Sequence, residues 1–257
     1  AGQRGGEQQR EGGPDGSGHD RREHTGLLRS ASHAQWRRGL MSAEGTLVTR
    51  GHFEYIAART TPEGRVLADL KAAAREAGIP AIWISPEQAS LMQILLRAIG
   101  ARTVIEVGTL AGYSAIAMAR ALPAGGMVHT IELEPKHAEF AERWVARSDA
   151  AGKVTVHRGA GLDVLPRFGA ESADAAFLDA DKSNYPGYLR ESLRIVRTGG
   201  LILVDNAFAF GQLLDEHPTD REVGAVRAFN EVMAKESRLQ SVIVPIGDGL
   251  WVGVKLR

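Results

Sequence analysis

The chain has 257 residues, of which 44% are hydrophobic, so it is long enough and apolar enough to bury a sizeable core in one large α/β domain. It contains no cysteine, which excludes disulfide bonds, thiolate zinc sites and cysteine nucleophiles. The formal net charge is zero, and no apolar run approaches the roughly 18 residues of a membrane span, so composition favours neither a nucleic-acid-binding nor a membrane protein.

The first forty residues differ in composition from the rest. Residues 1–40 are rich in Gly, Arg, Gln, Glu and Ser and carry seven Arg against five Asp and Glu, whereas 41–257 carry 24 basic and 26 acidic residues. Because the first segment has almost no apolar periodicity, we expect a disordered leader or expression-derived segment at 1–40 and a single domain at 41–257. It shows no apolar signal segment, which together with the lack of cysteine indicates a cytoplasmic protein.

Residues 41–100 are expected to form N-terminal helices, because apolar residues recur there at helical spacing. The apolar faces of the first two helices comprise Phe53, Ile56 and Ala57, and then Val66, Leu67, Leu70 and Ala74. Ser85 predicts the start of a third helix as its N-cap, with Gln88 completing a capping box. Some of these apolar faces are not needed to cover the sheet, and we expect them to form a dimer interface.

From residue 101 onward, short apolar runs alternate with helical patterns, as expected for a sheet core at 101–257. Strands are predicted at 104–107, 128–132, 154–157, 175–179 and 201–205, and helices near 112–121, 135–149, 184–197 and 220–236. Two further strands, at 241–245 and 250–255, flank a Gly-Asp-Gly turn and predict an antiparallel hairpin. This order predicts an α/β fold with a doubly wound, mostly parallel seven-stranded sheet.

Two carboxylate clusters stand at the ends of predicted strands. Asp179 and Asp181 end the fourth strand, and Asp205 and Asn206 end the fifth. If these strands are neighbours, Asp179, Asp205 and Asn206 converge about one strand spacing apart, about 4.8 Å. Hard oxygen ligands at that separation suit Mg²⁺, with Mn²⁺ or Ca²⁺ as the other candidates. Taken singly, each pair would equally suit a turn after a strand.

The first predicted strand ends in a glycine-containing loop, with Gly108 and Gly112 before Ser114. Glycine lets a ligand approach the backbone, and Ser114 can begin the next helix. The second strand ends at Glu132, twenty residues after Gly112, where a carboxylate can bind both hydroxyls of a ribose. The G-x-x-x-G spacing differs from the dinucleotide fingerprint, which argues against a nicotinamide oxidoreductase. Alone, this loop would equally suit a plain strand-to-helix turn.

Together, these motifs make the chain resemble the S-adenosylmethionine (SAM)-dependent, divalent-metal-dependent O-methyltransferases, the family of the catechol and caffeoyl-CoA O-methyltransferases and their bacterial relatives. The matching segments, within 46–257, are 106–114, 131–132, 159–160, 177–185, 204–206 and 247–250. The resemblance implies a Rossmann-like methyltransferase fold, bound SAM and a small hydroxylated aromatic substrate.

The resemblance also implies residue roles. The residues implied to bind SAM are Ile84, Glu106, Gly108, Ser114, Glu132, Ala160 and Asp179. The implied metal ligands are Asp179, Asp205 and Asn206. Lys182 is the implied general base, although without the family pattern it would be interpreted as an ordinary partner of Asp181. The residues implied to face the substrate are Asp248, Tyr185 and Phe208, and Asp248 equally suits a glycine-flanked turn.

The chain departs from the family pattern just after Asn206. Relatives often carry a Leu-Trp pair where Phe208 and Ala209 stand, and that Trp forms the wall of an aromatic pocket. Because Ala209 is small and has a phenylalanine on either side, we expect a reshaped pocket, or one in which a phenylalanine replaces the wall. The departure concerns the substrate and not the reaction.

The predicted function is transfer of the SAM methyl group to a hydroxyl of a catechol-like or other vicinal-hydroxyl small molecule, assisted by a divalent metal that lowers the pKa of the hydroxyl and holds it in position. One alternative is a tRNA hydroxyuridine O-methyltransferase, which the net charge of 41–257 and the lack of a Lys/Arg run disfavour. The other is a non-catalytic SAM-binding module, which would need neither the metal ligands nor Lys182.

Overall fold

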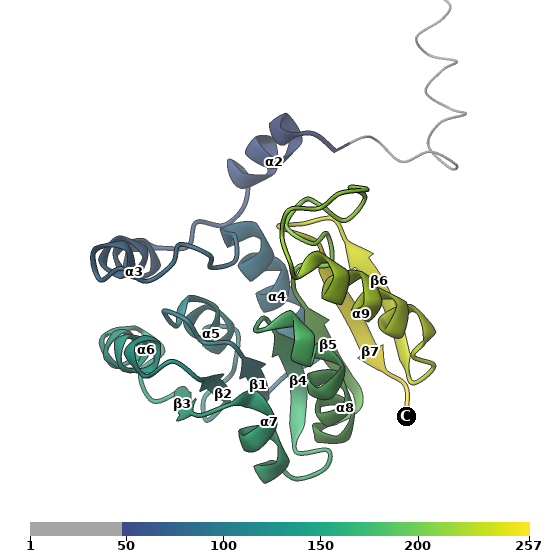
Figure 1. The fold of residues 1–257 in the computed structure, drawn as a ribbon. Helices are drawn as coiled ribbons and strands as arrows, with labels where there is room; N and C mark the ends of the chain where they lie inside the picture. Colours follow the sequence, from purple (N-terminus) through teal and green to yellow (C-terminus); the bar gives the residue numbers. More distant parts are fainter. Residues whose placement is uncertain (1–47) are drawn as a thin grey trace, which may run out of the picture. The chain divides into compact units, whose positions relative to one another are not determined.

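A seven-stranded sheet in the order β3-β2-β1-β4-β5-β7-β6 runs through the part of the chain that the computed structural model describes, residues 48–257 (Figure 1). The strands are β1 (Thr103–Val107), β2 (Met127–Glu132), β3 (Val154–Arg158), β4 (Ala173–Leu178), β5 (Val196–Val204), β6 (Leu239–Val244) and β7 (Leu250–Lys255). In the sheet, neighbouring strands among β3, β2, β1, β4 and β5 are parallel, and β7 runs antiparallel to both β5 and β6. The predicted doubly wound sheet with its antiparallel hairpin is therefore confirmed. The leader predicted at 1–40, and residues 41–47, lie outside the described residues.

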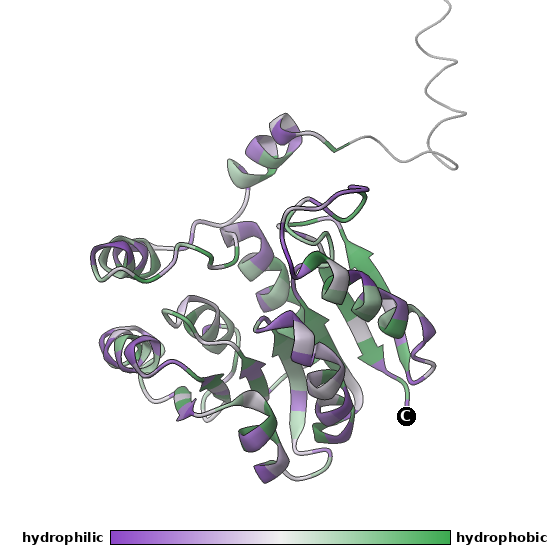
Figure 2. Ribbon diagram, viewed as in Figure 1, coloured by the Kyte–Doolittle hydropathy of each residue, from purple (hydrophilic) through white to green (hydrophobic). Residues whose placement is uncertain are grey.

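Helices cover both faces of the sheet. They are α2 (Arg50–Ala57), α3 (Arg65–Glu76), α4 (Pro86–Ala98), α5 (Tyr113–Ala119), α6 (Pro135–Arg147), α7 (Gly161–Val164), α8 (Tyr185–Ile195) and α9 (Val223–Lys235), with 3-10 turns η1 (Leu165–Arg167) and η2 (Lys182–Asn184). Successive strand side chains point to opposite faces, so Val104 packs with α3 to α6 while Ile105 packs with α7 to α9. Figure 2 shows strands that are mostly hydrophobic, between helices that carry both hydrophobic and hydrophilic residues.

The order of the strands reverses beside β1. The chain builds β1, β2 and β3 outward to one side, then returns to place β4 on the other edge of β1. In open parallel sheets, ligands bind outside the carboxyl ends of the strands at such a reversal. The fold therefore predicts a site at the ends of β1 and β4.

The N-terminal helices match their predicted patterns only in part. Leu67, Leu70 and Ala74 are buried on α3, as predicted. In contrast, α2 has no buried residue, so its predicted apolar face is exposed in the single chain. The Oγ of Ser85 accepts the backbone N–H of Gln88 at 3.2 Å, which confirms the N-cap. The second half of the capping box is wrong, because the Gln88 side chain is directed at Asp205 and does not accept the backbone N–H of Ser85.

Four predicted boundaries shift around the carboxylate clusters. Asp179 and Asp205 follow β4 and β5 by one residue instead of ending them, although their backbone N–H groups still bond Val107 and Leu178. The helix predicted at 184–197 ends at residue 195, where β5 begins at once, five residues before the predicted strand. Sequence patterns missed this start because two glycines interrupt the apolar run of β5.

None of the helices in the described range is long and apolar enough to span a bilayer.

Candidate active site

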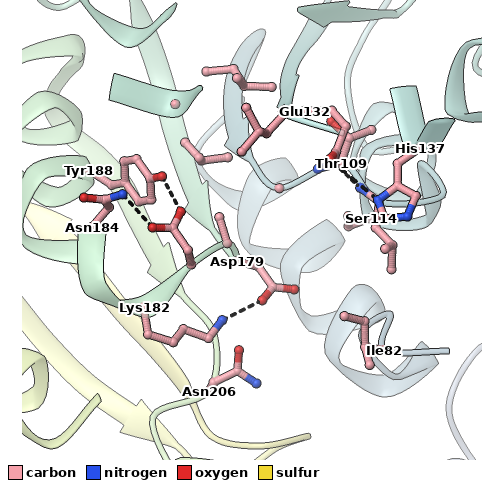
Figure 3. Close-up of a pocket in the computed structure, with 18 of the residues that line it drawn as sticks. Ile82, Thr109, Ser114, Glu132, His137, Asp179, Lys182, Asn184, Tyr188 and Asn206 are labelled. Atoms are coloured by element: carbon pink, nitrogen blue, oxygen red, sulfur yellow. Dashed lines mark hydrogen bonds and ion pairs between the residues drawn. The ribbon is translucent and has the colours of Figure 1, made fainter. Parts of the chain in front are cut away.

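A cavity of about 530 Å³ opens at the carboxyl ends of the parallel strands, at the predicted reversal (Figure 3). Predicted site residues that line it are Ile84, Gly108, Ser114, Glu132, Ala160, Asp179, Lys182 and Asn206. Predicted site residues outside its lining are Glu106, Asp205, Tyr185, Phe208 and Asp248. The cavity therefore brings together residues from five strand ends, and the five remaining residues support its wall or lie beside it.

Two glycines allow the loop after β1 to reach the cavity. Gly108 has a φ of 102°, and a Cβ there would lie 1.9 Å from the carbonyl oxygen of Asp179. Gly112 has a φ of 88° and immediately precedes α5. Both conformations disfavour other residues, and glycine at position 108 lets the loop backbone lie directly against the end of β4.

The carboxylate of Glu132 is held by the loop backbone. Its Oε2 accepts the N–H groups of Thr109 at 3.1 Å and Leu110 at 2.8 Å, and its Oε1 accepts that of Glu134 at 2.9 Å. His137 lies 3.7 Å from Oε1 and also lines the cavity, a placement that no sequence pattern indicated. Figure 3 shows Glu132 beside the glycine loop, where its position is fixed before any ligand binds.

Glu106 is a buried acid under the cavity floor. Neither carboxylate oxygen has a partner with normal hydrogen-bond geometry, although the hydroxyls of Ser114 and Thr130 lie near enough to affect its charge state. Burial raises its pKa to about 8, because an apolar environment disfavours the charged form. A buried polar group without a partner indicates a site that a bound group can complete.

The predicted carboxylate pair stands at adjacent strand ends. β4 and β5 are parallel neighbours, so Asp179 and Asp205 follow them side by side. Burial, and then the charge of Asp179, raise the pKa of Asp205. Lys182 lowers the pKa of Asp205, but its positive charge does not offset burial and the charge of Asp179. A further positive charge would therefore stabilise both carboxylates.

Asn206 completes this set with an amide. It has a φ of 64°, a conformation that Asn tolerates better than most residues. Its Nδ2 donates to Asp248 at 3.1 Å, and Figure 3 shows its oxygen pointing toward Asp179 and Lys182. Asp248 also accepts the N–H groups of Phe210 and Gly211, so it holds the loop that carries Asn206.

Lys182 extends over the carboxylate pair. Its Nζ lies 3.2 Å from Asp179 Oδ1 and donates to the hydroxyl of Tyr185 at 2.7 Å, with the side chain buried. The alternative partner, Asp181, instead accepts the hydroxyl of Tyr188 and the amide of Asn184, both at 2.6 Å. The ordinary pairing of Lys182 with Asp181 is therefore excluded.

Tyr185 supports Lys182 from beneath. Its ring is buried outside the cavity lining, and burial with the nearby Asp179 and Asp205 carboxylates raises its pKa well above the ordinary value of 10. It therefore remains a neutral phenol whose hydroxyl accepts from Lys182.

The loop after Asn206 places one of its two phenylalanines in the cavity wall. Phe210 lines the cavity, 6.0 Å from Lys182 Nζ to the ring centroid, whereas Phe208 packs against Gly249 of the hairpin turn. Ala209 and Phe210 both have positive φ, which turns the chain so that Phe210 reaches the wall. Of the two expected arrangements, the structure supports a replaced aromatic wall.

Some site residues carried no clear sequence signal. Gln88 was predicted only as part of a cap, yet its Nε2 donates to Asp205 Oδ1 at 2.8 Å. Glu222, which precedes α9, and Tyr188 on α8 also line the cavity. The helical spacing that places Tyr188 near Asp181 is visible in the sequence, but the long-range contact of Gln88 is not.

The residues present fit a divalent cation and a nucleoside ligand. Among the described residues, no group of three or more His, Cys, Asp or Glu side chains could hold a metal ion. The candidate set is instead two carboxylates and one amide oxygen, hard ligands of the kind that Mg²⁺ and Ca²⁺ take. The held carboxylate of Glu132, which lines the cavity, suits the hydroxyls of a nucleoside.

Comparison with known proteins gives a consistent picture. Residues 57–256 match the model of the O-methyltransferase family. The catechol O-methyltransferase of Niastella koreensis is 40% identical over 183 residues, which are 70% of this chain and 80% of the relative. The crystal structure of the O-methyltransferase from Bacillus cereus in complex with SAH has a TM-score of 0.72 and 33% identity and covers 80% of this chain and 97% of that chain. The O-methyltransferase TomG from Streptomyces achromogenes, in complex with SAM, has a TM-score of 0.71 and 32% identity, with coverage of 80% and 96%.

Proposed function

The chain belongs to the O-methyltransferase family, and on this premise we propose that it transfers the methyl group of SAM to a hydroxyl of a catechol-like or other vicinal-hydroxyl small molecule, assisted by a divalent cation. The SAM and SAH complexes of the solved relatives support the donor, and the catechol O-methyltransferase relative supports the acceptor. One observation carries the proposal: Asp179, with Lys182 bound to it, stands beside Asp205 at the cavity that Glu132 lines.

SAM supplies an electrophilic methyl group on a sulfonium. We assign its ribose hydroxyls to Glu132, because three backbone N–H groups hold that carboxylate at the cavity wall. Its methionine end is assigned to Gly108 and Ser114, above the buried Glu106. The backbones of Ala160 and Ile84, both in the lining, complete the assignment.

Asp179, Asp205 and Asn206 would hold the cation, which when bound would lower the pKa of an acceptor hydroxyl. The raised pKa of Asp205 supports this assignment, because a bound cation would supply the positive charge that stabilises the ionised carboxylate.

Lys182 is the residue that we assign to take the proton of the acceptor hydroxyl. Its contacts with Asp179 and Tyr185 fix the nitrogen at the wall, and its burial separates it from bulk water. Tyr185 remains neutral there, so it orients Lys182 and does not compete as a base.

The charge of the cavity supports a small acceptor over tRNA. Among the charged residues that line it, Glu132, Asp179, Asp181 and Glu222 oppose Lys182. A polyanion would meet repulsion there, whereas an uncharged diphenol would not. A non-catalytic SAM-binding module would have no use for the Lys182 contacts.

Transfer of label from methyl-labelled SAM separates the three functions: label on diphenols indicates the small acceptor, label on bulk tRNA the tRNA enzyme, and label on neither the binding module.

We further propose that the protein is a cytoplasmic homodimer. The exposed apolar residues of α2 support the dimer, and the lack of cysteine is consistent with a reducing compartment.

The direct test replaces Asp205 or Asn206 by Ala. We expect Mg²⁺-dependent methylation of a diphenol to fall by at least about 100-fold, because a lost ligand removes both the cation and its effect on the hydroxyl. Affinity for S-adenosylhomocysteine (SAH), measured by calorimetry, should change by less than about threefold, since neither side chain is assigned to the donor. Asp215→Ala, an exposed acid of the same loop, is the control. Undiminished wild-type turnover in excess chelator would overturn the metal assignment.

A further inference from the structure

Gln88 makes a buried contact that joins the first turn of α4 to the end of β5. Its side chain is 1% exposed, and its Nε2 donates to Asp205 Oδ1 at 2.8 Å across 117 positions of sequence. The helix cap does not need this side chain, because Ser85 is satisfied by the backbone N–H of Gln88. The carboxamide is therefore free of any local role and is directed at Asp205.

The hairpin turn confines the same carboxamide from another direction. A Cβ on Gly247 would lie 2.2 Å from Oε1 of Gln88, and Gly247 has a φ of 57°. Only glycine allows the turn to lie this close without displacing the amide. Gln88 is thus held between Gly247 and Asp205, and one orientation of its amide is selected.

The chemistry of the contact suits a cation ligand. A neutral amide uses one lone pair of Asp205 and fixes the plane of the carboxylate, but it leaves the negative charge of Asp205 available. A lysine or arginine in this place would compete with a cation for that charge. Neither Gln88 nor Asp205 lines the cavity, so the hydrogen bond lies behind its wall.

We infer that Gln88 is a positioning residue, whose hydrogen bond turns the Asp205 carboxylate toward Asp179 and Asn206 and thereby sets the affinity for the divalent cation. The inference rests on the proposed function, because it requires Asp205 to be a ligand. Replacing a residue that hydrogen-bonds a metal ligand commonly weakens the affinity for the metal about 10- to 100-fold.

The test is Gln88→Met, which keeps the length and apolar stem of the side chain and removes the donor. Gln93→Met is a matched control, because Gln93 lies on the same helix and its Nε2 also donates at 2.8 Å, but to the backbone oxygen of Ala117. The probe is Mn²⁺, with bound and free ion counted by electron paramagnetic resonance. We expect Mn²⁺ to bind at least about tenfold more weakly to Gln88→Met and within about twofold of wild type to Gln93→Met. SAH affinity should be unchanged in both.

The outcomes separate the inference from the function beneath it. If wild-type protein binds no Mn²⁺, the metal assignment fails. If wild type binds Mn²⁺ and Gln88→Met binds it equally well, Gln88 does not position Asp205. If Gln88→Met fails to fold, Gln88→Asn, which shortens the amide by one methylene, answers the same question. A further readout is the Mg²⁺ dependence of turnover. If Gln88 positions Asp205, Gln88→Met needs a higher Mg²⁺ concentration for half-maximal rate but keeps the KM for SAM. If Gln88 is merely structural, the two quantities change together.

Discussion

Glu106 is a single residue whose charge state changes on folding. Burial raises its pKa from an ordinary 4.5 to about 8, so the folded protein at neutral pH holds it mostly as a neutral acid, whereas the unfolded chain holds it ionised. Folding therefore takes up a proton at this residue. Its contribution to stability is fully present below pH 4.5 and is lost as the pH rises through 8.

Replacing Glu106 by Gln tests this pH dependence, because the amide has nearly the same shape and no charge. We expect the free energy of unfolding of Glu106→Gln to rise relative to wild type as the pH increases from about 5 to about 9, by up to roughly 1.4 kcal/mol for each pH unit. Urea denaturation at a series of pH values measures the difference. Parallel curves for the two proteins would show that Glu106 ionises normally in the fold.

At the scale of elements, the sequence predicts what depends on local periodicity. All seven strands were predicted, because each carries an apolar run bounded by turn residues. The start of β5 was not, since Gly199 and Gly200 resemble a loop. Gly200 is nevertheless required in the strand: a Cβ there would lie 2.5 Å from the carbonyl oxygen of Asp174. Such a close approach between segments has no signal in the local sequence.

The loop at 206–222 is the element that the sequence predicts least. Asn206, Ala209 and Phe210 all have positive φ although none is glycine, and Arg227 on α9 holds the loop by donating to the backbone oxygens of Gln212, Leu213 and Asp215. Asp248 accepts the Nδ2 of Asn206 and the backbone N–H of Phe210, and these long-range bonds hold left-handed conformations that local propensity disfavours. Sequence patterns could indicate a reshaped pocket, but they could not tell which phenylalanine forms its wall.

The two phenylalanines of this loop should respond differently to truncation. Phe210→Ala is expected to raise the KM for a diphenol by roughly 10-fold, since it removes an aromatic wall from the cavity, and to leave SAH affinity unchanged. Phe208→Ala should instead lower the melting temperature, because that half-buried ring packs on Gly249 of the hairpin turn, at a cost of about 1–2 kcal/mol. Steady-state kinetics and thermal unfolding of both variants check the assignment. Equal KM values for Phe210→Ala and wild type would place the acceptor elsewhere.

At the scale of the whole molecule, the N-terminal helices are linked to the cavity wall. Glu63, between α2 and α3, accepts the hydroxyl of Tyr113 at 2.8 Å and pairs with Lys71 at 2.6 Å. Tyr113 lines the cavity.

The apolar periodicity of these helices is visible in the sequence, but which face is buried within one chain depends on what lies opposite it. α3 packs on the core beside the sheet, whereas no element among residues 48–257 buries the face of α2.

The exposed face of α2 leads to the prediction about assembly. Phe53 and Ile56 are 37% and 40% exposed, and large apolar side chains gathered on one helical face favour association with a second copy. We expect the full-length chain to be a dimer at micromolar concentration and Phe53→Ser/Ile56→Ser to be a monomer, with light scattering after size exclusion as the measurement. Val232→Ser, at 41% exposure on α9, is the control and should remain dimeric. Because the substituted side chains lie outside the cavity lining, SAH affinity should persist in the monomer, which would show that the variant is folded. A wild-type mass equal to that of one chain would refute the dimer, and a dimeric double variant would place its interface away from α2.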